Sequence, residues 1–161
     1  ERRALADILR QQIYGVMWSA TGIDQYYPAT YEPPQTDLAS DETFHNMQPP
    51  DLHPEDLSLD ILSAAREMSG DVPILYVNEP IYISHGKNSD IRYNFFYPKW
   101  AYDQYRQAFA ETCQQESWQC LDEWNLIPPN EFTNSAIHMT PLGTKILATQ
   151  IEQSIYSLAN P

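Results

Sequence analysis

His138 is the residue whose surroundings most suggest chemistry. One residue separates it from Thr140-Pro141, a pair that predicts the start of the last helix with Thr140 as its N-cap. Open α/β folds place reactive side chains in loops that lie beyond a strand and before a helix. An imidazole in such a loop suits general acid–base chemistry near neutral pH. The alternative is a structural histidine near a helix start.

Polar residues also follow an apolar run at 72–77, which predicts a buried strand of a parallel sheet. Asn78 and Glu79 end this run, where side chains point into a crevice in open α/β sheets, and His85 lies in the same loop. All three are candidates for substrate binding. The alternatives are a carboxylate that solvates the turn and a surface histidine. The spacing of His45 and His53 suits no metal site, and we expect neither a metal ion nor a cofactor.

The two cysteines, Cys113 and Cys120, are too far apart for a CxxC redox motif and lack the partners of a zinc site. They could form a disulfide, which would favour an exported, extracytoplasmic protein slightly over a cytoplasmic one. Two buried free thiols are the other interpretation, because the sequence does not fix the geometry that a disulfide needs.

The elements that position these residues come from hydrophobic periodicity. A helix is predicted over 1–14, with Leu5, Ile8, Leu9 and Ile13 at helical spacing, Gly15 as its end and a short strand or a buried loop at 16–18. Residues 1–21 precede a Pro-rich excursion at 22–53, which lacks a sustained period and indicates a lid or covering loop. Residues 54–161 form the predicted core, so that 1–161 is a single α/β domain or the carboxy-terminal part of one.

Within the core, the order is helix, strand, helix, strand, helix. The first helix starts at Pro54, with a stripe at Leu57, Ile61, Ala64, Ala65 and Met68, and ends at Gly70. The next helix begins at Pro98, a shorter strand covers 118–124, and the last helix begins at Pro141. This alternation predicts an α/β fold. Two clear strands are fewer than the usual four to six of a doubly wound sheet, so we expect part of a larger domain.

Here the sequence resembles the SGNH (GDSL-type) hydrolases, esterases and lipases with a flavodoxin-like three-layer α/β/α fold. The resemblance rests on FTNSAIHMTPLGTKILA, which looks like the family's last conserved block, and on VPILYVNEP and WQCLDEWNLIPPNEF, which look like its buried strands. It covers roughly 56–160. It implies that His138 is the general base that takes a proton from a serine nucleophile, in an esterase or acyltransferase.

The sequence departs from this family in two places. Ser135 stands where the family has the Asp that orients the imidazole, and a neutral hydroxyl stabilises an imidazolium poorly. Asn134, one residue earlier, could hold the ring instead by a hydrogen bond, as could a main-chain carbonyl. No Gly-Asp-Ser occurs in the chain, and Gly86-Lys87-Asn88-Ser89-Asp90 is better interpreted as a turn than as the family's Gly-x-Asn-Asp block. The nucleophile is therefore expected outside this chain, which alone is expected to be inactive.

The net charge of the chain argues against several classes of binding partner. The 161 residues include 9 Lys and Arg against 22 Asp and Glu, a net charge of −13. This argues against nucleic acid and anionic lipid, since both require clustered cations, and no apolar run approaches the roughly 18 residues of a membrane span. An ester-bearing small molecule or carbohydrate fits better, because a cluster of aromatic residues around 93–105 could stack on sugars.

Two hypotheses remain. The first is an SGNH-like acyl hydrolase or acyltransferase, and the second is a non-catalytic remnant that binds a glycan or a protein. A fragment of this kind should expose sheet edge and apolar surface, so we also predict self-association or binding of a missing amino-terminal half.

Overall fold

The structure, a computed structural model, describes residues 2–21 and 32–159, except the side chains of 2–5, 7, 8 and 159. Contacts group the chain into two compact units, Glu1–Tyr31 and Glu32–Pro161. The first unit contains helix α1, Arg2–Thr21. The second contains α2, Asp60–Ser69; β1, Leu75–Asn78; α3, Lys99–Gln115; β2, Gln119–Asp122; and α4, Pro141–Ala159.

Helix α1 corrects the prediction that Gly15 ends a helix and that residues 16–18 form a strand or a buried loop. The helix continues through both, to Thr21. One interior glycine costs only about 1 kcal/mol relative to alanine, which a helix of this length tolerates. Of the predicted apolar stripe, the Leu9 and Ile13 side chains are exposed, while those of Leu5 and Ile8 lie outside the described residues. Residues 22–31 of the Pro-rich excursion also lie outside them.

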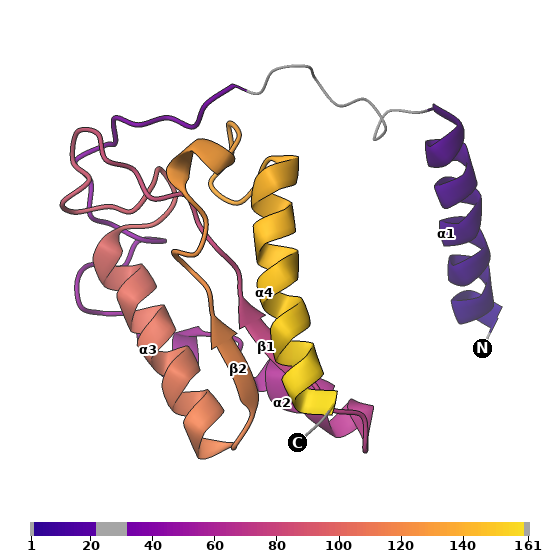
Figure 1. The fold of residues 1–161 in the computed structure, drawn as a ribbon. Helices are drawn as coiled ribbons and strands as arrows, with labels where there is room; N and C mark the ends of the chain where they lie inside the picture. Colours follow the sequence, from indigo (N-terminus) through magenta and orange to yellow (C-terminus); the bar gives the residue numbers. More distant parts are fainter. Residues whose placement is uncertain (1, 22–31, 160–161) are drawn as a thin grey trace. The chain divides into compact units, whose positions relative to one another are not determined.

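The second unit is a mixed α/β structure built on a small parallel sheet. β1 and β2 pair in parallel, with Leu75 opposite Gln119 and Asn78 opposite Asp122. Figure 1 shows α3 on one side of the two strands and α4 on the other. The predicted strands are thus present, though each is shorter than its apolar run. The described residues contain these two strands as their sheet, so the structure supports the α/β class without a larger layered sheet.

Two hydrophobic clusters hold the strands and helices together. Tyr76 of β1 packs with Phe109 and Cys113 of α3. Beyond the strands, Tyr82, Ile127 and Phe132 from the loops pack with Leu147 of α4. The first cluster fixes α3 beside the sheet, and the second fixes the loops that follow both strands.

The prediction of a helix that starts at Pro54 is wrong about where the helix starts and about which of its side chains are buried. Pro54–Asp56 form a separate 3-10 turn, η2, and α2 begins only at Asp60. The side chains of Ile61 and Met68 are exposed, and Leu62 instead packs on the Tyr76 cluster. The face of α2 that packs on the sheet is therefore the one that carries Leu62. Gly70 does end the helix, with a φ of 58° that favours glycine.

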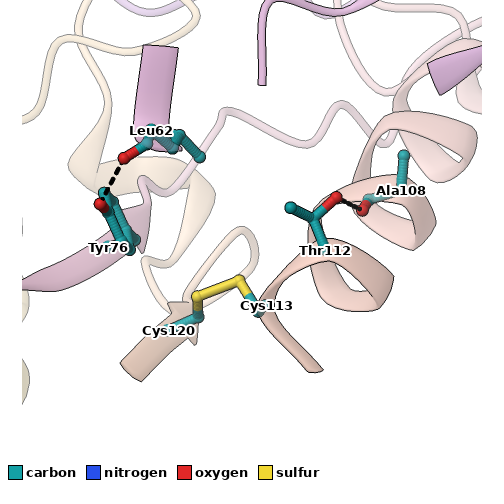
Figure 2. Close-up of a disulfide and its surroundings, with 6 residues drawn as sticks. All are labelled: Leu62, Tyr76, Ala108, Thr112, Cys113 and Cys120. Carbon is teal, nitrogen blue, oxygen red and sulfur yellow. Dashed lines mark hydrogen bonds between the residues drawn. A yellow bond between two sulfur atoms is a disulfide. The ribbon is translucent and has the colours of Figure 1, made fainter. Parts of the chain in front are cut away.

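The disulfide between Cys113 and Cys120 is present and joins the end of α3 to β2 (Figure 2). The Tyr76 hydroxyl of the neighbouring strand donates a hydrogen bond to the Leu62 carbonyl of α2, 2.6 Å away. The end of α3, both strands and α2 are therefore linked at one end of the sheet. The opposite end, where both strands finish, holds the polar residues considered next.

Candidate functional site

A cavity of about 360 Å³ lies at the carboxyl end of β1. We call it the strand-end cavity. Four parts of the second unit line it: the covering segment 36–57, the end of β1 with the residues that follow it, the start of α3 and the loop before α4. The lining residues are Phe44, Leu52, Leu57, Asn78, Glu79, Ile81, Tyr97, Ala101, Tyr102, Tyr105 and Ile137. Ligand sites of open α/β folds lie at this position.

Asn78 is the buried polar residue of this cavity, with only 7% of its surface exposed. Its Nδ2 donates to Asp122 Oδ1 of the neighbouring strand at 2.7 Å. The Tyr105 hydroxyl donates to its Oδ1 at 3.3 Å, and the Tyr102 hydroxyl lies 3.3 Å from Nδ2. The amide therefore has partners on both β2 and α3, which fixes it at the inner wall of the cavity.

Asp122 continues this network to the surface. Its Oδ2 accepts hydrogen bonds from Arg106 Nε at 2.9 Å and from Nη2 at 2.6 Å. The guanidinium carbon of Arg106 also lies 4.2 Å from the centre of the Trp124 ring. A two-bond arginine–carboxylate pair of this kind fixes orientation as well as charge. Asp122 is consequently ion-paired with Arg106 and is held toward Asn78.

Burial raises the pKa of Tyr102 and of Tyr105 above the ordinary tyrosine range. For Tyr105, the charge of Asp122 raises it further. Both hydroxyls therefore keep their protons throughout the neutral range and can donate to Asn78 Oδ1. The wall of the cavity is polar at this point but carries no charge of its own.

Glu79 supplies the carboxylate among the described lining residues, and it is solvent-exposed. Within the described ranges, no hydrogen bond or ion pair involves its carboxylate. The cavity is otherwise lined by aliphatic and aromatic side chains. This combination disfavours anionic ligands and suits a neutral apolar group.

The loop before α4 is held to the body of the unit by main-chain hydrogen bonds. Phe132 and Met139 form an antiparallel bridge, and Thr133 N donates to His138 O at 2.9 Å. Tyr82 N donates to the carbonyl of Ala136, which is fully buried, at 2.8 Å. Ile137 lines the cavity, and the adjacent His138 is exposed. The loop thus places an accessible imidazole next to a residue of the cavity wall.

The helix that follows has the predicted N-cap. Thr140 Oγ1 accepts a hydrogen bond from Gly143 N at 3.2 Å, and Pro141 occupies the first helical position. Gly143 is buried, and a Cβ at this position would lie 3.0 Å from the main-chain oxygen of Glu131. The Thr-Pro-x-Gly pattern is therefore used for capping and for close packing against the loop that bears His138.

The structure does not bring Ser135 or Asn134 onto the imidazole of His138. Ser135 Oγ accepts a hydrogen bond from Ile137 N at 3.3 Å, which stabilises the loop itself. Asn134 is exposed. In the part of the chain that the structure describes, no hydrogen bond joins either side chain to the His138 ring. The local geometry thus gives Ser135 a role in turn formation, and in the described residues neither Ser135 nor Asn134 orients the His138 ring.

His85 is exposed and is absent from the cavity lining. It lies before the turn at 86–90, where Ser89 N donates to Gly86 O at 3.3 Å, as the sequence predicts. A Cβ on Gly86 would collide with the main-chain carbonyl of Thr36. Glycine is needed here because the covering segment packs directly on this turn.

Sequence reasoning missed Asp122 as a neighbour of the site, and it placed Tyr102 and Tyr105 only in an aromatic cluster that could stack on sugars. The available signal for Asp122 was positional: Asn78 and Asp122 both end parallel strands, so their side chains meet at one edge of the sheet.

Among the described residues, no cluster of three or more His, Cys, Asp or Glu could hold a metal ion. No helix in those residues combines the length and apolarity needed to cross a bilayer.

No protein-family model, curated protein or solved structure matches this chain.

Proposed function

We propose that this chain is the base-bearing portion of an SGNH-like serine esterase or acyltransferase, with a flavodoxin-like domain completed by residues outside it. One observation supports this most: the loop that presents His138 also contributes Ile137 to the wall of the strand-end cavity. A general base must lie within reach of the bound substrate, and this loop places an exposed imidazole beside an apolar cavity.

In the proposed reaction, a serine hydroxyl attacks the ester carbonyl while His138 accepts its proton. The tetrahedral intermediate collapses, the C–O bond to the alcohol breaks, and the imidazolium returns the proton to the leaving alcohol. Water then attacks the acyl-enzyme and gives a carboxylic acid. A second alcohol in place of water gives acyl transfer.

The serine is assigned to a segment outside this chain. The sequence has no Gly-Asp-Ser, and in the described part of the structure no serine hydroxyl hydrogen-bonds to His138. The 161-residue chain alone is therefore proposed to be inactive. Its disulfide favours an extracytoplasmic location, because oxidising compartments preserve such bonds.

The strand-end cavity is assigned to the acyl group. Its aliphatic and aromatic lining suits a neutral hydrocarbon chain. The carboxylate of Glu79 would repel the ionised carboxylate product of hydrolysis and so aid its release. Asn78 is held by Asp122 and by the tyrosine hydroxyls, so its contribution is to shape the wall.

The test is hydrolysis of p-nitrophenyl acetate by a longer product that also carries residues encoded upstream of Glu1. His138→Ala should lower kcat/KM by about 10²–10⁴-fold, the usual contribution of a general base. His85→Ala is the matched control, since both histidines are exposed and lie in loops of the same unit. Equal loss in both variants, or no loss in either, would overturn the assignment.

A second function is favoured because no described residue hydrogen-bonds to the His138 ring. Because neither Asn134 nor Ser135 orients His138, the site also fits a non-catalytic remnant that binds a glycan or protein. Ligand binding with no turnover by the longer product would establish this alternative.

A further inference from the structure

A second cavity, of about 280 Å³, lies beside the strand-end cavity. We call it the aromatic cleft, and its lining is Thr43, Phe44, His45, Phe95, Phe96 and Tyr97. Phe44 and Tyr97 line both cavities, and their ring centres are 6.2 Å apart. One ligand could therefore occupy both cavities, with one part in each and the Phe44 and Tyr97 rings beside the junction.

A buried asparagine fixes one wall of the aromatic cleft. Asn94 is fully buried, and its Nδ2 donates to Tyr82 O at 2.9 Å. Its Oδ1 accepts hydrogen bonds from Phe96 N at 2.9 Å and from Tyr97 N at 3.0 Å. The main chain at 96–97 is thus held rigidly, while 58% of the surface of Phe96 remains exposed. Rigid presentation of an exposed aromatic ring favours recognition, since little ordering is needed on binding.

A buried arginine joins the two walls. Arg92 is only 6% exposed, and its described hydrogen bonds all go to main-chain carbonyls. Nε donates to Asn94 O and Nη2 to Phe95 O, both at 3.2 Å, and Nη1 donates to Asp41 O of the covering segment. Segments about fifty residues apart in the sequence are therefore held at a fixed separation across the cleft.

The opposite wall has an unusual main-chain conformation. Phe44 and Met47 exchange main-chain hydrogen bonds of 3.1 and 2.9 Å around His45 and Asn46. Both central residues have positive φ, 50° and 68°, where glycine is usual. This turn exposes His45, whose ring lies edge-on to Phe44 with centres 4.5 Å apart. Such conformations concentrate at ligand sites.

The chemistry of the aromatic cleft selects a neutral ring. None of its described lining residues is Lys or Arg, and the chain has a net charge of −13, which disfavours an anion. The Arg92 guanidinium donates a hydrogen bond to the carbonyl of the lining residue Phe95, so a positive charge lies close by, which disfavours a cation. Aromatic faces with a hydroxyl and an imidazole at their edge suit a sugar, because a sugar ring has an apolar C–H face and a rim of hydroxyl groups.

We propose that the aromatic cleft is a stacking subsite for a neutral sugar ring. The sugar is the alcohol portion of the ester whose acyl group enters the strand-end cavity. This role in catalysis rests on the proposed function, but binding of the sugar itself does not.

The test is titration of the 161-residue chain with four neutral β-linked hexasaccharides, those of glucose, xylose, mannose and N-acetylglucosamine, by isothermal calorimetry. At least one should bind saturably, and Phe96→Leu, which removes the ring but keeps apolar bulk, should weaken its Kd by about threefold to tenfold. Phe96→Tyr should keep the affinity. Tyr156→Leu, which removes an exposed aromatic from α4, should leave Kd unchanged.

Absence of binding by all four sugars, or binding that Phe96→Leu does not weaken, would overturn the subsite. Binding of tetramethylammonium that depends on Phe96 would overturn it too, since the site would then select a cation. The p-nitrophenyl acetate assay separates this result from the enzymatic proposal. Sugar binding without ester hydrolysis contradicts the esterase alone, and hydrolysis without sugar binding contradicts the subsite alone.

Discussion

Asn78 connects the strand-end cavity to the rest of the second unit. Its side chain contacts Asp122 on β2 and the hydroxyls of Tyr102 and Tyr105 on α3, and almost none of its surface is exposed. A buried amide with this many partners is expensive to replace, because each partner would lose its hydrogen bond inside the protein.

Asn78→Leu should therefore lower the free energy of unfolding by about 2 kcal/mol, the cost of leaving buried polar partners unsatisfied. Urea unfolding followed by tryptophan fluorescence measures this change. The matched control is Asn125→Leu, because Asn125 is exposed, and its effect should stay within about 0.5 kcal/mol. Equal effects of the two substitutions would show that the Asn78 network does not stabilise the fold.

The raised pKa of Tyr93 predicts that the protein loses stability at high pH. Burial, followed by the hydrogen bond to Asp103, raises the pKa of Tyr93 from 10.0 to about 12. Between these values, the folded protein retains a proton that the unfolded chain has lost, so the free energy of unfolding falls as pH rises. The stabilisation is complete below pH 10 and disappears as pH approaches 12.

Tyr93→Phe should make this alkaline decline shallower than in the unsubstituted protein. Urea midpoints measured from about pH 8 to about pH 12 would show the difference. Tyrosinate absorbance of the folded protein should show less late ionisation in the variant, in which Tyr102 and Tyr105 still ionise late. The same decline in both proteins would exclude Tyr93 as its source, and Tyr156→Phe, at an exposed position, is the control.

The positions of the candidate site residues in the fold were partly predictable from the sequence. The apolar run before Asn78 and Glu79 predicted a strand end, and the structure places both residues there and in the cavity lining. Their role in substrate binding stays a prediction. The ends of the two strands could have indicated the contact of Asn78 with Asp122. The contact with Tyr102 was not predictable, because it depends on how α3 packs against the sheet.

At the scale of elements, the disulfide is the clearest local restraint. Cys113 lies near the end of α3 and Cys120 lies in β2, with a sequence separation of 7. The bond therefore holds the strand to the helix that precedes it (Figure 2). Cys113 also belongs to the buried cluster with Tyr76 and Phe109, so the restraint acts within the core.

Replacing both cysteines by serine should lower the free energy of unfolding by about 2–3 kcal/mol, the value expected from loop closure in the unfolded chain. Urea unfolding of the double variant measures it. Alkylation of the unreduced, denatured parent followed by intact mass should show no free thiol. Alkylation of both cysteines would show that the bond does not form.

The sequence predicted helices and strands better than their ends. Pro98 and Thr140-Pro141 do begin helices, since a proline can occupy the first turn without losing a needed hydrogen bond. Pro54 gave the same signal, yet it begins only a 3-10 turn. Local signals of this kind do not show how far a helix continues, because packing of Leu62 beneath Tyr76 determines where α2 lies.

At the scale of the whole molecule, the second unit exposes apolar surface around α2. The side chains of Ile61, Met68 and Val72 are 63%, 88% and 63% exposed. In the described residues, β1 and β2 are each other's partners in the sheet, so each has an edge without a strand partner. Parallel strands are normally buried within larger sheets, and unpaired edges promote association.

We therefore predict that the 161-residue chain self-associates in sedimentation velocity experiments. Ile61→Lys with Met68→Lys should shift it toward the monomer, because charge on this face opposes burial. Ser63→Lys with Glu67→Lys adds lysines to exposed positions of the same helix and should leave association unchanged. A strictly monomeric parent would contradict the prediction.

The central claim, that this chain supplies the base to a serine located elsewhere, is tested most directly with a fluorophosphonate probe. The probe is added to the 161-residue chain and to the longer product, and intact mass with peptide mapping locates the label. We expect label only on the longer product, at a serine upstream of Glu1, and its loss on His138→Ala. Label within residues 1–161, label that survives His138→Ala, or no label on either product would contradict the account.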